Sequence, residues 1–301
     1  MFGEGIPLFI KFMMKDVYKK QLPNWYDGNE KYDLILTDDI DSLLSCAILK
    51  QVKQWSIEQV FLFKADPNKS IDYLGKTSNA TNEAVGVDLA LQNGKCFDNH
   101  VTRISSTDKW NDECINLNFI KDVTRQNYFS KYNLSTVLLL WSLYDLPIPE
   151  SEDGKMILLA IDSSYYSYFS KYPNDRNMNK FYLCDVLGLH ELYECQKRHK
   201  QYEFKDIEKK YGLDKKIKAK KGILHTEIDL IGINMEIGWY TDIWCELPKE
   251  QFKLHKTFID VQMPITGNRT IENITDNPFS VALTRRDFIC YSEEMKEENV
   301  K

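Results

Sequence analysis

The sequence predicts an α/β fold in which a doubly wound, mainly parallel sheet is followed by a divergent, β-rich α+β C-terminal domain. Short apolar runs at 34–36, 59–63 and 84–87 are separated by polar turns and helical patterns. This alternation is typical of parallel strands that are joined by helices. After residue 223, apolar segments alternate with Gly, Pro and Asn, which favours short strands and turns.

Composition limits the classes of protein that the chain can belong to. Of its 301 residues, 43% are hydrophobic and 13% aromatic, so it can bury a sizeable core. The net charge of −6 argues against a nucleic-acid-binding coat over the whole surface, although a local basic groove remains compatible with it. The seven cysteines are scattered and contain no CxxC pair, which favours a reducing cytoplasm over a disulfide or zinc-ribbon scaffold. No apolar run approaches the ~20 residues of a membrane span, so we expect a cytoplasmic protein.

The chain is expected to divide into four segments. Residues 1–30 form an N-terminal extension, whose first 13 residues lack the basic start and cleavage site of a signal peptide. Residues 31–190 form the α/β domain. Residues 191–222 are rich in lysine and predict a basic helical connector, either a solvated face or a contact for a phosphate backbone over 197–221. Residues 223–301 form the β-rich domain, with strands expected at 228–233, 239–244, 258–261, 279–283 and 288–291.

The first predicted strand leads directly into a turn that is rich in carboxylates. The run 34–36 ends at Thr37, and Asp38, Asp39 and Asp41 precede a helical pattern with apolar residues from 43 to 52. In an open parallel sheet, ligands bind beyond the carboxyl ends of the strands, where this turn lies. Carboxylates crowded there repel each other unless a hard divalent cation binds between them. The simpler alternative is that Asp41 or Ser42 caps the helix.

Acidic residues recur at the ends of the next predicted apolar segments. Asp88 ends the strand at 84–87, Asp98-Asn99-His100 ends the strand at 95–97, and Asp162 lies inside the apolar run 156–169. A carboxylate inside an apolar run needs a partner or a functional site. The helix predicted over 133–146 lies between the last two of these groups, and Ser135 can cap it.

In order, these motifs resemble those of the DHH phosphoesterase superfamily, which includes RecJ-type exonucleases, nano-RNases, cyclic-dinucleotide phosphodiesterases and family-II inorganic pyrophosphatases. DIDSLLSCAI looks like the first motif, VGVDLAL like the second, Asp98-Asn99-His100 like the Asp-His-His motif, and LLAIDSSY like the fourth. The resemblance covers about residues 31–170. It implies a catalytic domain that binds Mn²⁺ (or Mg²⁺), with two ions held by Asp39, Asp41, Asp88 and Asp162.

Two features depart from the family pattern. Asn99 replaces a histidine that usually ligates metal in the family, and an amide oxygen is a weaker ligand for Mn²⁺ than an imidazole. The chain also lacks a GGGH-like motif, so its C-terminal half is divergent. The nearest functional analogue is the pair Arg285 and Arg286, which is expected to bind phosphate. Like the two arginines, Asn99 is expected to bind the substrate.

These residues together predict a metal-dependent phosphoesterase. Two divalent ions would activate water for attack on a phosphodiester or phosphoanhydride in a nucleotide or short oligonucleotide. His100, with Asp98 beside it, is expected to donate a proton or hold the scissile phosphate. The alternative is a degenerate relative that binds or senses a nucleotide, or acts as an assembly partner, without turnover. The aromatic residues Tyr165, Tyr166, Tyr168 and Phe169 are expected in the core, with base stacking as the alternative.

Overall fold

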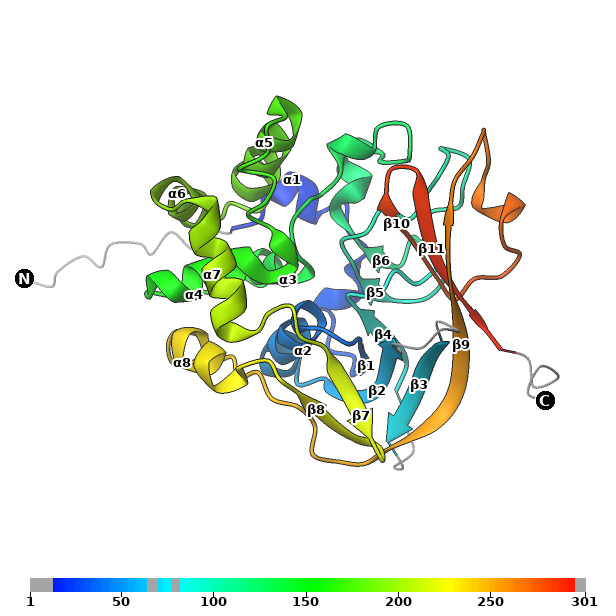
Figure 1. The fold of residues 1–301 in the computed structure, drawn as a ribbon, viewed down its shortest axis with the longest axis horizontal. Helices are drawn as coiled ribbons and strands as arrows, with labels where there is room; N and C mark the ends of the chain where they lie inside the picture. The colour runs from blue at the N-terminus through cyan, green and yellow to red at the C-terminus, as the bar shows by residue number, and fades with distance from the viewer. Residues whose placement is uncertain (1–12, 64–69, 77–81, 296–301) are drawn as a thin grey trace, which may run out of the picture.

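The computed structural model describes residues 13–63, 70–76 and 82–295, and these form a mixed α/β fold with one large sheet. Residues 1–12 of the expected extension lie outside the described part, and residues 16–19 form the short helix α1 (Asp16–Lys19). Within the described residues the large sheet has nine strands, in the order β10-β11-β9-β3-β2-β1-β4-β5-β6 (Figure 1). The structure therefore confirms the prediction that the fold is α/β.

The parallel part of the sheet lies within the segment where the sequence predicts it. Strand β1 (Asp33–Leu36) pairs in parallel with both β2 (Ser56–Phe63) and β4 (Ala84–Val87). The ladder continues in parallel through β5 (Cys96–Phe97) to β6 (Cys114–Ile115). Helix α2 (Ile40–Lys53) is the crossover between β1 and β2.

An antiparallel part extends the same sheet beyond β2. Strand β3 (Ser70–Lys76) pairs with β2 on one side and with the long strand β9 (Phe252–Pro264) on the other. Strands β11 (Phe288–Glu294) and β10 (Ser280–Arg285) follow outward from β9. The C-terminal strands therefore continue the sheet that begins at β1, and β9 to β11 do not form a sheet of their own.

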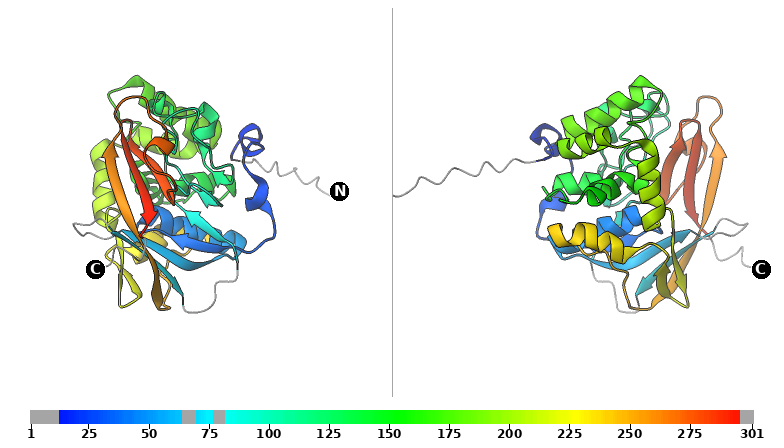
Figure 2. Two further views of the ribbon diagram at one scale, coloured as in Figure 1. Left: turned by 90° about the vertical axis from the view of Figure 1, so that its right-hand side faces the viewer. Right: turned by 60° about the vertical axis from the view of Figure 1, so that its left-hand side comes forward.

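The sheet curls until its antiparallel edge meets loops from its parallel end (Figures 1 and 2). Val281 N–H donates to the Ala90 carbonyl at 2.9 Å, and Leu283 N–H donates to the Val101 carbonyl at 2.7 Å. Ala90 and Val101 follow β4 and β5, so edge strand β10 gains backbone partners from segments more than 180 positions earlier in the chain. This contact hides part of an edge that would otherwise be open to other chains.

Helices cover one face of the sheet, which corrects the prediction of a doubly wound sheet with helices on both faces. On the helical face, residues of β1, β2 and β4 pack with the buried sides of α2, α3 (Thr136–Leu143) and α4 (Glu152–Ala160). The opposite face forms a smaller core inside the curl, where Phe61 and Phe258 are buried and Phe279 packs against them. The connections at 88–95 and 98–113 are mostly irregular and hold no crossover helix, so the curled sheet covers this face itself.

The remaining described elements follow α4. Helix α5 (Pro173–Lys180) precedes α6 (His190–Arg198) and α7 (Gln201–Tyr211), which pack against α4. The basic segment is therefore helical up to Tyr211 and then enters the small antiparallel sheet of β7 (Ile217–Lys220) and β8 (Ile223–Thr226). Among the helices of the described residues, none is long and apolar enough to cross a membrane.

The strands predicted at 228–233 and 239–244 are wrong, because α8 (Leu230–Thr241) spans most of these residues. A continuous apolar run does not by itself distinguish a buried strand from a helix. The Asp229 side chain caps this helix by accepting from Gly232 N–H at 2.9 Å, a local signal that decides in favour of the helix.

We predict that Phe258→Ala destabilises the whole chain. The Phe258 side chain is 2% exposed and packs with Phe61 inside the curl, so its removal leaves a cavity that costs ~3–5 kcal/mol. Ile259→Ala, one position along the same strand and 37% exposed, is the matched control. Chemical denaturation followed by tryptophan fluorescence measures both variants. The prediction would be contradicted if the chain unfolded in two separate transitions and Phe258→Ala shifted only one of them.

Candidate functional site

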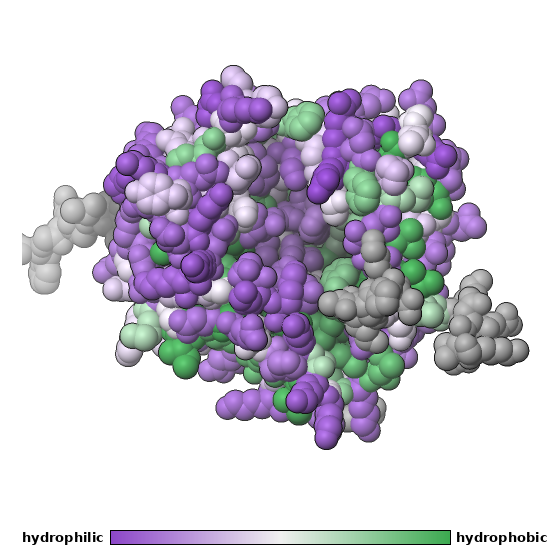
Figure 3. All heavy atoms as spheres, in the orientation of Figure 1, coloured by the Kyte–Doolittle hydropathy of each residue, from purple (hydrophilic) through white to green (hydrophobic). Residues whose placement is uncertain are grey.

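The predicted acidic residues meet beyond the carboxyl ends of β1, β4 and β5. One cavity of about 340 Å³ is lined by Asp39, Asp41, Asp88, His100 and Asp162. Figure 3 shows that hydrophilic residues predominate around the centre of the face on which these strands end in Figure 1. The cluster is therefore formed by segments spread over more than 120 positions of the chain.

Asp39 and Asp41 have different local roles at the start of α2. Asp39 is the N-cap of the helix, and its Oδ1 accepts from Ser42 N–H at 3.2 Å. Capping therefore belongs to Asp39, whereas the sequence suggested Asp41 or Ser42. Asp41 is buried, and its two carboxylate oxygens accept from the N–H groups of Thr136 at 2.9 Å and Val137 at 2.7 Å. The N-terminus of α3 thus stabilises the Asp41 carboxylate, as the helix dipole favours.

Asp88 turns into the cavity directly after β4. Its backbone φ of 54° lies in the left-handed region, which aspartate tolerates better than most residues. Its Oδ1 accepts from the Thr136 hydroxyl at 2.9 Å, so the start of α3 contacts Asp88 as well as Asp41.

Asp98 and His100 form a hydrogen-bonded pair after β5. His100 Nδ1 lies 2.8 Å from Asp98 Oδ1, and the other Asp98 oxygen accepts from Asn116 Nδ2 and from His100 N–H at 3.0 Å each. Asp98 is fully buried, so it fixes the imidazole ring and leaves Nε2 for the cavity that His100 lines. Asp98 supports the site from behind rather than lining that cavity.

Asn99 points to a carboxylate of the site instead of into the cavity. Its Nδ2 donates to Asp162 Oδ2 at 2.8 Å and to the Leu134 carbonyl at 3.1 Å. Asp162 follows α4 in a left-handed conformation, with φ of 51°, and Ser163 shares this conformation. The structure therefore places Asn99 behind Asp162, outside the residues that line the cavity, whereas the sequence grouped it with the substrate-binding residues.

Lys216 is a site residue that sequence analysis missed. Its Nζ lies 3.0 Å from Asp38 Oδ1 and 3.2 Å from Asp39 Oδ2. Ile217 N–H donates to the Asp38 carbonyl at 2.6 Å, which holds the start of β7 beside the turn after β1. In the sequence Lys216 is one of many lysines in the basic segment, and nothing there distinguishes it. Several other basic side chains of this segment pair elsewhere, for example Lys210 with Asp153.

The charges of the cluster are unbalanced at neutral pH. Burial raises the pKa of Asp38 to about 6, against the opposing effect of Lys216. Burial and then the neighbouring carboxylates Asp88 and Asp162 raise the pKa of Asp41 well above its usual range. Burial also raises the pKa of Asp88, with Asp39 as the next contributor. Burial lowers the pKa of His100, but the Asp98 carboxylate outweighs it and brings the value to about 9. The carboxylate-rich donor set fits a divalent cation.

Arg285 and Arg286 do not reach this cluster. Both are exposed at the turn between β10 and β11, whereas the adjacent Thr284 lines a second cavity that shares Asp39, Asp88 and His100 with the first. The bend of β10 over the parallel strands brings Thr284 to the site and leaves the arginines beyond it. The expectation that they bind phosphate at this site therefore has no support in their position.

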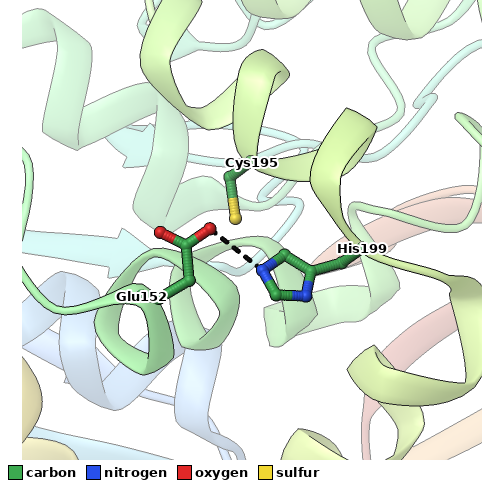
Figure 4. A group of neighbouring side chains, drawn as sticks. All are labelled: Glu152, Cys195 and His199. Carbon is green, nitrogen blue, oxygen red and sulfur yellow. Dashed lines mark hydrogen bonds and ion pairs between the residues drawn. The ribbon is translucent and has the colours of Figure 1, made fainter.

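Among the described residues, two groups of side chains have ligand atoms close enough to hold a metal ion. Asp88, Asp98 and His100 belong to the site above, and Glu152, Cys195 and His199 lie between α4 and the end of α6 (Figure 4). In the second group, His199 Nε2 lies 2.9 Å from Glu152 Oε1, and the Arg198 guanidinium donates to both Glu152 oxygens. Arg198 already compensates the Glu152 charge, so this group links α4 to the end of α6 without an added cation.

No family model, no curated protein and no solved structure matches this chain.

We predict that Asp88→Asn stabilises the protein in the absence of metal. The amide keeps the shape and the acceptor for Thr136 but removes one of the mutually repelling charges, so Tm should rise by ~2 °C or more, about 1 kcal/mol. Because the pKa of Asp88 is raised in the folded state, its charge costs stability only where it is ionised. The gain should therefore be larger at pH 8 than at pH 5.

Thermal denaturation in EDTA and in Mn²⁺ tests this prediction, with the exposed Asp112→Asn as the control. In Mn²⁺ the order should reverse, because the wild type alone keeps its full ligand set. A lower Tm of Asp88→Asn in EDTA would mean that the carboxylate is stabilising without metal.

Proposed function

We propose that this site is a metal-dependent phosphoesterase site for a phosphodiester or phosphoanhydride bond in a nucleotide or short oligonucleotide. The observation that carries the proposal is the crowding of Asp39, Asp41, Asp88 and Asp162 around one cavity, with Lys216 paired at its rim. Such an arrangement is costly unless cations bind between the carboxylates. The order of these motifs along the chain, which resembles that of the DHH superfamily, adds to this support.

Asp39, Asp41, Asp88 and Asp162 would hold two divalent ions, Mn²⁺ or Mg²⁺. When bound, such ions lower the pKa of a water molecule and stabilise the charge that develops at phosphorus. Asp41 can take part because each of its oxygens accepts one backbone N–H and keeps another lone pair. The hydrogen bond from Asn99 keeps Asp162 aimed at the same cavity.

His100 is the proton donor of the proposed reaction. Asp98 holds its Nδ1, and the pKa of about 9 keeps the ring protonated at neutral pH. From Nε2 the imidazolium donates a proton to the leaving oxygen. Lys216 lies between the two cavities that share Asp39 and His100, where its ammonium neutralises a non-reacting phosphate oxygen.

One observation favours the alternative of nucleotide binding without turnover. The Lys216 ammonium already pairs with Asp38 and Asp39. The chain itself therefore neutralises part of the negative charge that would otherwise favour a bound cation. Under this alternative the protein binds a nucleotide but does not hydrolyse it.

A metal-reconstituted activity assay separates the two functions. We expect hydrolysis of bis-p-nitrophenyl phosphate or of a short single-stranded oligonucleotide in Mn²⁺, and its loss in EDTA. The double variant Asp39→Asn/Asp88→Asn should bind no Mn²⁺ by calorimetry and should be inactive. If the wild type binds a nucleotide at saturating Mn²⁺ but does not hydrolyse it, the phosphoesterase proposal is wrong. The alternative, a nucleotide-binding protein without turnover, would then hold.

The pH dependence of the rate tests the role of His100. The Asp98 carboxylate raises the pKa of His100, so Asp98→Asn should lower this pKa and move the basic limb of the rate profile to lower pH. At pH 8, turnover should fall by about 10-fold for each unit by which the pKa of His100 drops below 8, because only the protonated ring can act as the acid. Asp112→Asn should leave the profile unchanged. If the basic limb of the rate profile does not move in Asp98→Asn, the proton donor is a residue other than His100.

A further inference from the structure

A third cavity opens beside Asp162. It has a volume of about 510 Å³ and shares Asp162 and Ser163 with the acidic cavity. Its other walls come from residues 128–133, before α3, and from residues 166–175, after α4. A ligand that lies in both cavities would pass directly over Asp162.

Two aromatic side chains line this cavity and remain exposed. Phe129 is 58% exposed and Tyr166 is 56% exposed. The neighbouring Tyr165 is buried, and its ring stacks on Phe204 at a centroid distance of 4.7 Å. The expectation of core packing therefore holds for Tyr165, whereas Tyr166 presents its ring to the cavity. Exposed aromatic rings beside a reactive centre are the usual platform for unpaired bases.

The same cavity offers a buried acceptor without a donor and an ammonium that donates to the Tyr128 hydroxyl at 3.3 Å. The side-chain oxygen of Asn133 is buried and accepts no hydrogen bond within the described part of the chain. The Lys131 ammonium lies 5.0 Å from the centroid of the Tyr128 ring and forms no ion pair with the described residues. A buried acceptor without a donor costs free energy unless a ligand or water supplies one. Lys131 offers a positive charge for a phosphate, and Asn133 an acceptor for an amino or hydroxyl group.

We propose that this cavity binds one nucleotide of a single-stranded oligonucleotide, whose base stacks on Phe129 and Tyr166. Lys131 contacts the adjacent phosphate, and Asn133 accepts from the base or the sugar. This inference rests on the proposed function, because it places the nucleotide next to the phosphodiester over Asp162. It also narrows the substrate class, since inorganic pyrophosphate has no π-face to stack and cannot fill a cavity of this size.

Binding of a fluorescein-labelled tetrathymidylate, measured by anisotropy in Ca²⁺, tests the subsite without requiring turnover. Phe129→Ala and Tyr166→Ala should each weaken binding by about 5-fold or more, the effect of losing one stacked base. Tyr202→Ala is the matched control, because Tyr202 is equally exposed, at 58%, but does not line the cavity. Lys131→Gln should reduce the salt dependence of binding by about one counterion.

An abasic oligonucleotide separates stacking from other effects. Successive replacement of each base by a tetrahydrofuran spacer should identify one position at which Phe129→Ala no longer weakens binding. An equal loss for intact and abasic strands, or no loss in either ring variant, would overturn the subsite.

The failure of this inference is distinguishable from the failure of the proposed function. If oligonucleotide binding depends on Phe129 and Tyr166 but no hydrolysis occurs in Mn²⁺, the proposed subsite is supported and the phosphoesterase function is rejected. If bis-p-nitrophenyl phosphate is hydrolysed but oligonucleotide binding does not depend on the two rings, the phosphoesterase function is supported and the subsite is rejected.

Discussion

The hydrogen bonds between the Asp41 carboxylate and the N-terminus of α3 are the constraint on which the site depends. They join the first turn of α2 to residues 136 and 137, about 95 positions later in the chain. A buried carboxylate is strongly disfavoured unless several donors satisfy it, and two backbone N–H groups at a helix N-terminus do so. Because Thr136 also contacts Asp88, the same helix end fixes the distance between the turns that follow β1 and β4. The cluster is thus held by donors of the chain before any cation binds.

The curl of the sheet supplies the second wall of the site. Strand β10 belongs to the antiparallel edge, yet its backbone bonds to Ala90 and Val101 place it over the ends of β4 and β5. The aromatic core around Phe61 and Phe258 fills the space within this curl. Removal of the C-terminal strands would therefore uncover the parallel strands as well as open the site, because no helix of the described residues covers that face of the sheet.

The sequence predicted the acidic cluster better than the surroundings that hold it. Asp39, Asp41, Asp88 and Asp162 could be found because each interrupts an apolar pattern, and such patterns are local properties of the chain. Lys216 could not be found, because its role depends on the backbone bond between Ile217 and Asp38, which joins segments almost 180 positions apart. The position of Arg285 and Arg286 away from the cluster could not be predicted for the same reason. A strand end can be predicted locally, but the direction in which the sheet curls cannot.

The distribution of charge implies an order of binding if the proposed function is correct. The carboxylates around the acidic cavity repel a phosphate group, and Lys216 cannot offset them alone because it is already paired with Asp38 and Asp39. Lys131 lies beside the third cavity, where it attracts a phosphate, and its charge also opposes the rise that burial causes in the pKa of Asp162. Cations must therefore bind between the carboxylates before the scissile phosphate can approach Asp162. The base, in contrast, can stack on Phe129 and Tyr166 without them, because the attraction of a neutral ring does not depend on the charge of the cluster.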